Sequence, residues 1–143
     1  MSYNTKAPAQ KLLTIIQGLS GMGSAQLGVP ESWGTKVCAY IGMGSQPTVK
    51  KATQVIGRDA RYFVSFGYRL DGAEATAEEA MMDLVDAFLA ALYADMTLGD
   101  TCKSIEVDTG LADAPEYQLR AGKEYREYPI IITCRQYGTY AVP

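Results

Sequence analysis

Histidine is absent from the 143-residue sequence, so the chain lacks the commonest general base in proteins. The same absence excludes the Ser–His and Cys–His pairs that activate most nucleophiles. The cysteines are three in number, Cys38, Cys102 and Cys134, and they lie far apart without a Cys-x-x-Cys spacing. We place each of them in a predicted strand, and an odd, scattered set predicts neither a disulfide framework nor a structural zinc site. We therefore expect no metal ion and no enzymatic activity.

Complete phosphate-binding glycine motifs are also missing. Gly18 and Gly23 have the spacing of a P-loop, but Ser24 stands where the phosphate-binding lysine belongs. Gly21 and Gly23 begin a Gly-x-Gly-x-x-Gly pattern that fails at Gln26. Neither run follows a strongly predicted strand, which both motifs need for their mechanism. No nucleotide or other cofactor is expected.

Long apolar runs do not occur, although 48% of the residues are hydrophobic. A membrane-spanning helix needs about 18 or more such residues in succession, so no membrane partner is expected. Residues 1–10 are polar and lack the basic and apolar regions of a secretory signal, so no export signal is expected. A chain of this length can bury one adequate core. We predict a single domain over residues 1–143, with a short tail from about residue 137.

The clearest positive pattern is a strand followed by a helix. In residues 61–70 every second side chain forms one face, typical of a half-buried strand, and this face consists of Tyr62, Val64, Phe66, Tyr68 and Leu70. Thr76 and Glu79 then match a capping box at a helix start. The helix that follows has an apolar stripe formed by Met81, Leu84, Val85, Phe88, Leu89 and Leu92. We expect this stripe to lie across the strand.

Similar patterns predict the remaining elements. A first helix is expected over residues 5–18, because Pro8 suits its first turn and Gly18 can end it. Further strands are predicted over residues 35–43, 48–56, 101–109 and 123–136, with residues 57–60 as the charged tip of a hairpin. Pro129 has no N–H, which indicates either the start of the last strand or a local edge. The stretches 20–34 and 110–122 are predicted to be long loops. The resulting order is helix, three strands, helix, two strands.

Charge is distributed unevenly along the chain. Residues 36–70 contain six basic residues against one acidic residue, whereas residues 71–100 contain eight acidic residues and no basic one. Two interpretations remain open: two solvated faces of one domain, or two complementary contact surfaces. In the second case the subunit-interface candidates are Lys50, Lys51, Arg58 and Arg61 on the basic side and Glu78, Glu79, Asp83 and Asp86 on the acidic side. The sequence pI of about 4.9 argues against specific nucleic-acid binding.

Aromatic residues supply the remaining candidates. The sequence contains ten tyrosines, which usually fill sheet surfaces but are also enriched at interfaces. Isolated aromatic side chains in the long loops and the tail are candidates for partner binding, namely Trp33, Tyr117, Tyr137 and Tyr140. By contrast, Glu79, Asp83 and Asp86 lie opposite the apolar stripe of their helix, so we interpret them as a solvated acidic face and not as acid–base catalysts.

The order of elements resembles the tail terminator proteins of long-tailed bacteriophages, also called tail completion or tail-to-head joining proteins. The resemblance covers nearly the whole chain and is carried by an arrangement of elements. These are the first helix with Leu12 to Leu19, the loop ending near Trp33, strand 61–70 with helix 75–93, and residues 119–134, where Leu119, Arg120, Tyr125 and Arg126 precede an apolar strand.

This resemblance implies an α+β fold, in which a mainly antiparallel sheet of about five strands carries two helices on one face. It also implies a structural virion protein, assembled in the host cytoplasm, that forms a six-membered ring with itself on the head-proximal end of the tail tube. Its partners would be the tail tube protein and the head connector or head-completion protein, and DNA would pass through the lumen without specific binding. The alternatives are a head-closure or tail-tube subunit and a small-molecule-binding domain.

Overall fold

The computed structural model describes residues 4–30, 36–52, 55–70, 74–111, 114–120 and 122–139, and for residues 49–52, 55, 56, 138 and 139 it describes the backbone alone. Within these ranges the chain forms two helices and seven strands. In chain order they are α1 (Lys6–Gln17), β1 (Ala25–Leu27), β2 (Cys38–Met43), β3 (Thr48–Ala52), β4 (Val55–Arg69), α2 (Glu74–Ala94), β5 (Ser104–Asp108), β6 (Glu116–Arg120) and β7 (Lys123–Thr139).

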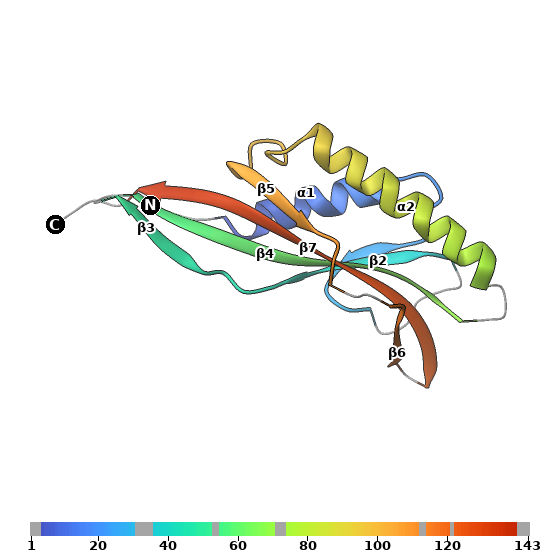
Figure 1. Ribbon diagram of the computed structural model, residues 1–143. Coiled ribbons are helices and arrows are strands. Elements are labelled where there is room, and N and C mark those ends of the chain that lie inside the picture. The colour runs from blue at the N-terminus through green and yellow to red at the C-terminus, as the bar shows by residue number, and fades with distance from the viewer. Residues whose placement is uncertain are drawn as a thin grey trace.

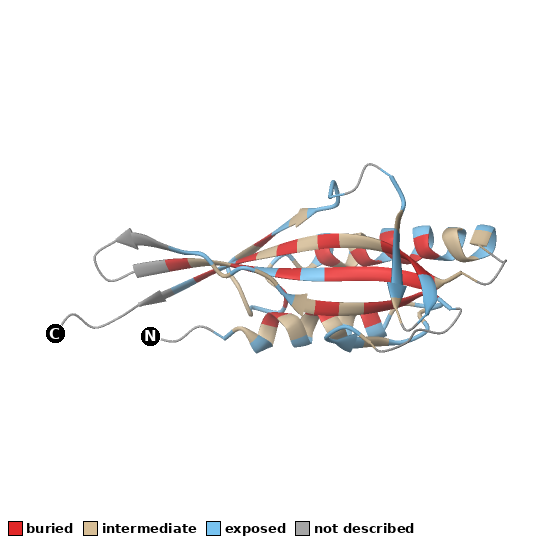
Figure 2. Cartoon of the chain, turned by 90° about the horizontal axis from the view of Figure 1, so that it is seen from below, coloured by how far each residue is buried: buried red, intermediate tan, exposed pale blue. Residues whose placement is uncertain are grey.

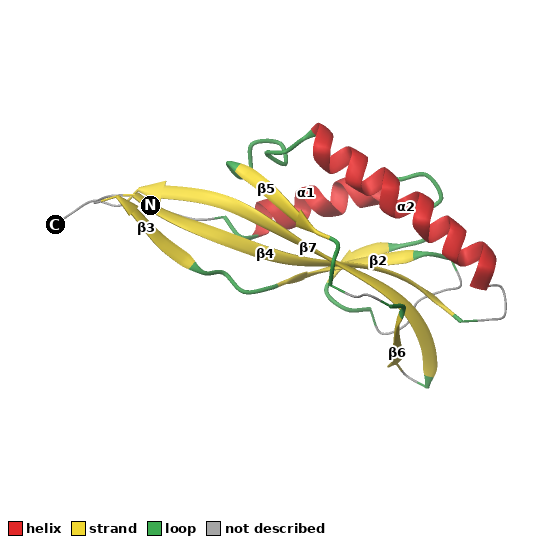
Figure 3. Ribbon diagram, in the orientation of Figure 1, coloured by secondary structure: helices red, strands yellow, loops and turns green. Residues whose placement is uncertain are grey.

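The strands form one sheet in the order β1-β2-β4-β7-β5, with β3 added beside β4 and β6 added beside β7. Only the pairing of β1 with β2 is parallel among the described pairs. Both helices lie on one face of this sheet (Figures 1 and 3). The predicted α+β fold with a mainly antiparallel sheet is therefore confirmed, and β1 and β6 are two short strands beyond the five expected.

The two longest strands, β4 and β7, form the centre of the sheet. They pair without interruption from Val55↔Thr139 to Arg69↔Tyr125. The predicted inward face of β4 is confirmed, because Tyr62, Val64, Phe66 and Tyr68 are buried. The corresponding face of β7 contributes Ile130, Ile132 and Cys134, each 0% exposed. The core of the protein thus lies between these two strands and the helix layer.

Helix α2 covers the core with the stripe predicted from its sequence. Met81, Leu84, Val85, Phe88 and Leu92 are buried, and Leu89 is half-buried. The ring centroid of Phe88 lies 5.4 Å from that of Phe66, with the planes tilted by 59°. The capping-box prediction was wrong: the helix already begins at Glu74, so Thr76 lies within it. An acidic residue in the first turn suits the positive end of the helix dipole, which is consistent with the earlier start.

Helix α1 agrees closely with its prediction. Pro8 is buried in its first turn, and the N–H of Gly18 donates to Thr14 and Ile15 at the helix end. Leu12 and Ile16 are fully buried in the same core as α2.

Several predicted boundaries were wrong. Residues 57–60 are not a hairpin tip; they are part of β4, where they pair with residues 134–137 of β7. Strand β3 ends at Ala52 and β4 begins at Val55, so the connection between them lies outside the described ranges. The predicted loops 20–34 and 110–122 contain β1 and β6, and β7 continues to Thr139, so residues 137–139 are not a tail. Cys102 precedes β5 and does not lie in a strand.

Pro129 lies inside β7 at a position that explains how a proline is tolerated there. On one side it pairs with Ser65 of β4. On the other side the pairing with β6 ends at Glu127 and the pairing with β5 begins at Ile131. The residue therefore occupies a gap between two neighbouring strands, and the prediction of a local edge is confirmed.

One end of the sheet extends past the helix layer (Figure 1). We call this extension the arm; it consists of β3, residues 55–59 of β4 and residues 135–139 of β7. On the face that carries no helix (Figure 2), a small second cluster forms where Cys38, Tyr40 and Tyr125 pack together. Arg120 of β6 lies 5.9 Å from the centre of the Tyr40 ring and joins β6 to this cluster.

Alkaline pH is expected to destabilise the protein through its buried tyrosines. Burial raises the pKa of Tyr62 from 10.0 to about 12, and its hydroxyl donates to the Thr5 carbonyl oxygen at 2.6 Å. Between these two pH values the unfolded chain loses a proton that the folded chain keeps, so the free energy of unfolding falls as pH rises, by up to about 1 kcal/mol per pH unit.

Denaturant unfolding between pH 8 and pH 12 measures this decline. Tyr62→Phe should make it shallower, while Tyr117→Phe, which alters an exposed tyrosine, should leave it unchanged. An identical slope for both variants and the unaltered chain would contradict the assignment.

Candidate assembly interface

The basic candidates lie in or beside the arm. Arg58 is half-buried, and its Nη2 donates to Oε1 of Gln136 at 2.6 Å, so this guanidinium is already engaged within the chain. Arg61 is exposed at the base of the arm, where its Nη1 donates to the Ser45 hydroxyl at 3.0 Å. Lys50 and Lys51 belong to β3, but their side chains lie outside the described part of the structure. Of the two candidates whose side chains are described, Arg61 is more available to a partner than Arg58.

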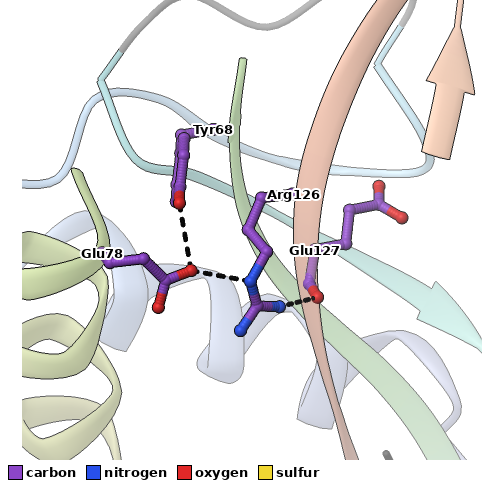
Figure 4. A network of polar contacts seen from close by, with 4 residues as sticks. All are labelled: Tyr68, Glu78, Arg126 and Glu127. Atoms are coloured by element: carbon purple, nitrogen blue, oxygen red, sulfur yellow. Dashed lines mark hydrogen bonds and ion pairs between the residues drawn. The ribbon is translucent and has the colours of Figure 1, made fainter. Parts of the chain in front are cut away.

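The acidic candidates lie on the first half of α2. Glu79, Asp83 and Asp86 are exposed, as the predicted acidic face requires. Glu78 differs, because its side chain turns inward toward the sheet. Its Oε1 accepts hydrogen bonds from the Tyr68 hydroxyl at 3.0 Å and from Nε of Arg126 at 2.6 Å (Figure 4). Glu78 therefore mainly binds Tyr68 and Arg126 within the chain, and only part of its charge faces the surface.

The Glu78–Arg126 pair fixes α2 to the sheet. Only 10% of the Arg126 side chain is exposed, and its Nη1 also donates to the carbonyl oxygen of Glu127. Burial and the hydrogen bond to Glu78 raise the pKa of Tyr68 above its usual range, so this hydroxyl remains a donor. A buried charge with two acceptors satisfies the requirement that buried ions be paired.

Sequence reasoning missed this network, although a signal was present. Arg126 has the same parity in β7 as Ile130, Ile132 and Cys134, so strand alternation already places it on the helix face. A charged residue on an apolar face needs a partner, and the acidic helix was the obvious source.

A second, partly buried ion pair joins β6 to β7. Nη2 of Arg120 lies 2.9 Å from Oε1 of Glu127, and only 6% of the Glu127 side chain is exposed. Burial, together with the negative charge of Glu127, raises the pKa of the neighbouring Tyr40. The short strand β6 was not visible as a pattern because its side chains are mostly exposed and lack an apolar alternation.

Two of the four aromatic candidates lie within the described part of the chain. Tyr117 in β6 and Tyr137 in the arm are exposed, at 57% and 51% respectively. Trp33 and Tyr140 lie outside the described residues. Other apolar side chains are also exposed on the sheet, including Met43, Phe63 and Leu119. These positions remain candidates for contact with a partner.

The thiols offer no metal site. Cys38, Cys102 and Cys134 are all free, and the Cys102 thiol interacts with that of Cys134, which raises the pKa of Cys134. Across the described ranges, no three His, Cys, Asp or Glu side chains come close enough to share a metal ion. Neither described helix combines the length and the apolar character needed to cross a membrane.

The arrangement keeps the basic arm and the acidic start of α2 apart within the subunit. In Figure 1 the arm forms one end of the molecule, while the start of α2 lies at the other end. The basic and acidic candidates are therefore not brought together within one chain. Comparison with protein-family models and with curated proteins finds no match to this chain.

Proposed function

We propose that this chain is a structural subunit of a bacteriophage neck, a tail terminator that assembles into a ring on the head-proximal end of the tail tube. The ring stops tail polymerisation and joins the tube to the head connector. The observation that carries this proposal is that the arm, with Lys50, Lys51 and Arg58, and the start of the acidic helix α2 lie at opposite ends of an elongated subunit (Figure 1). The order of elements, which resembles that of tail terminators, supports it.

A ring needs a particular kind of contact between its subunits. Each copy must present one surface to a different surface of the next copy, and the rotation between copies must close. A basic arm at one end and an acidic helix start at the other suit such a head-to-tail contact. Exposed ion pairs contribute only about 0–1 kcal/mol each, so in this proposal the charges set register and encounter rate while apolar contacts stabilise the ring.

Related structural roles differ from this one in the assembly that they form. A tail-tube subunit would continue to add rings into long tubes, whereas a terminator stops at a closed ring. Electron microscopy of the purified protein separates these cases, because tubes, single rings and monomers differ in outline. A field of monomers at all concentrations would contradict the proposal.

Reversal of the available arm charge is expected to weaken assembly. Arg61→Glu replaces attraction by repulsion at each contact, so the midpoint concentration of assembly should rise by about fivefold to tenfold at low salt. Sedimentation velocity over a concentration series measures this midpoint. Lys123→Glu makes the same charge change at an exposed site at the far end of β7, and it should have little effect. If both variants assemble like the unaltered chain, the charged faces are merely solvated.

A further inference from the structure

A pocket opens between α2 and β7 at the place where Arg126 meets the helix. Its volume is about 330 Å³, which suits one long side chain and is too small for a folded element. The carboxylates of Glu78 and Asp86 bound it two helical turns apart. Met81 and Val85 give it an apolar floor. The pocket thus combines acidic groups with apolar surface.

The charged groups around the pocket determine whether it favours a cation or an anion. Arg126 also lines it, but its Nε is bonded to Glu78 and its Nη1 to the carbonyl oxygen of Glu127. Both contacts of Glu78 use Oε1, so in Figure 4 its second oxygen points away without a drawn partner. Asp86 adds a second negative charge, and α2 contains no basic residue. Arg126 and Glu78 carry opposite charges, so Asp86 leaves the pocket with one net negative charge, which favours a cation over an anion.

The apolar lining further limits which kind of cationic group can occupy the pocket. Lysine and arginine carry a charged head on a methylene stem, and such stems bury well along apolar surface. Met82 stands at the rim with 60% of its surface exposed, and methionine adapts readily to an irregular partner. A cationic side chain that enters past Met82 would place its stem against Met81 and Val85 and its head beside the Asp86 carboxylate.

We propose that this pocket receives a lysine or arginine side chain from the arm of a second copy of this chain, an inference that rests on the proposed ring. The arm supplies suitable cations: exposed Arg61 at its base, and Lys50 and Lys51 in β3. In this contact the acidic surface is the pocket lined by Glu78 and Asp86. Glu79 and Asp83, which do not line the pocket, become bystanders.

A lysine placed at the rim tests this contact. Met82→Lys introduces a lysine four residues after Glu78 and four before Asp86, a spacing at which ion pairs form on a helix. The new ammonium group should occupy the pocket from within its own chain and exclude that of the neighbour. Ala80→Lys is the matched control, because it adds the same charge at an exposed position of α2 outside the pocket.

Sedimentation velocity and denaturant unfolding are measured on both variants and on the unaltered chain. Met82→Lys should raise the midpoint concentration of assembly by about tenfold or more without lowering stability, and Ala80→Lys should change the midpoint by less than about threefold. Equal effects of the two variants on a chain that does form rings would overturn the pocket contact and leave the ring intact. A chain that never forms rings would overturn both proposals.

Discussion

Replacement of Phe88 by alanine is expected to lower the free energy of unfolding by about 3–5 kcal/mol. The Phe88 side chain is 0% exposed and meets the ring of Phe66 at a centroid distance of 5.4 Å. Its removal leaves a cavity between α2 and β4 in addition to the lost burial of apolar surface. Helix α2 and the sheet enclose the site from both sides, so little collapse is available to fill the space.

Phe63→Ala is the matched control for this change. It removes the same atoms from the opposite face of β4, where Phe63 is 42% exposed. Urea unfolding at a concentration where the protein is monomeric should show a much smaller loss for Phe63→Ala. Similar losses for both variants would mean that the core does not lie on the helix side of the sheet.

Replacement of Arg126 by methionine is expected to lower the free energy of unfolding by about 3 kcal/mol, near the lower end of the range for breaking a buried ion pair. The change leaves the Glu78 carboxylate beside the sheet without its cation. The Glu78 side chain is 28% exposed, so water reaches part of it and limits the loss. Guanidinium unfolding is less suitable than urea here, because the denaturant salt screens charges.

Two further variants test the cause. Arg135→Met removes an exposed arginine that lies 2.5 Å from Glu106, and it should cost less than about 1 kcal/mol. The double variant Glu78→Gln with Arg126→Met should recover part of the loss, because it no longer holds an unpaired charge. No recovery in the double variant would show that Arg126 acts through its packing and not through its charge.

The parts of the fold that sequence predicted are those with strong local periodicity. The alternation of Tyr62 to Tyr68 and the stripe from Met81 to Leu92 each repeat over several turns or residue pairs, so local pattern was sufficient. The ends of elements were less certain. Residues 57–60 contain Gly57 and Asp59, which resemble a turn, but their backbone is paired with β7 and tertiary pairing overrides this preference.

The short strands and the pocket depend on partners in other elements of the fold. Ala25–Leu27 and Glu116–Arg120 carry little apolar alternation, and they become strands because β2 and β7 offer free edges beside them. The sequence of α2 does not distinguish Glu78 from the other acidic residues of the helix. The pairing register of β7 does, because it places Arg126 opposite Glu78. A single sequence gives the charges on each element but not which elements meet.

The central β4–β7 pairing also bears on how the protein emerges from the ribosome. Every one of its residue pairs joins positions on opposite sides of α2, β5 and β6. The sheet centre therefore cannot close during most of translation, and such long-range closure makes folding slow. Until β7 has been synthesised, the inward side chains of β4 have only helices to cover them, and unpaired strand edges of this kind are prone to aggregate. Slower translation through β5 and β6 would prolong the interval in which a chaperone must protect β4.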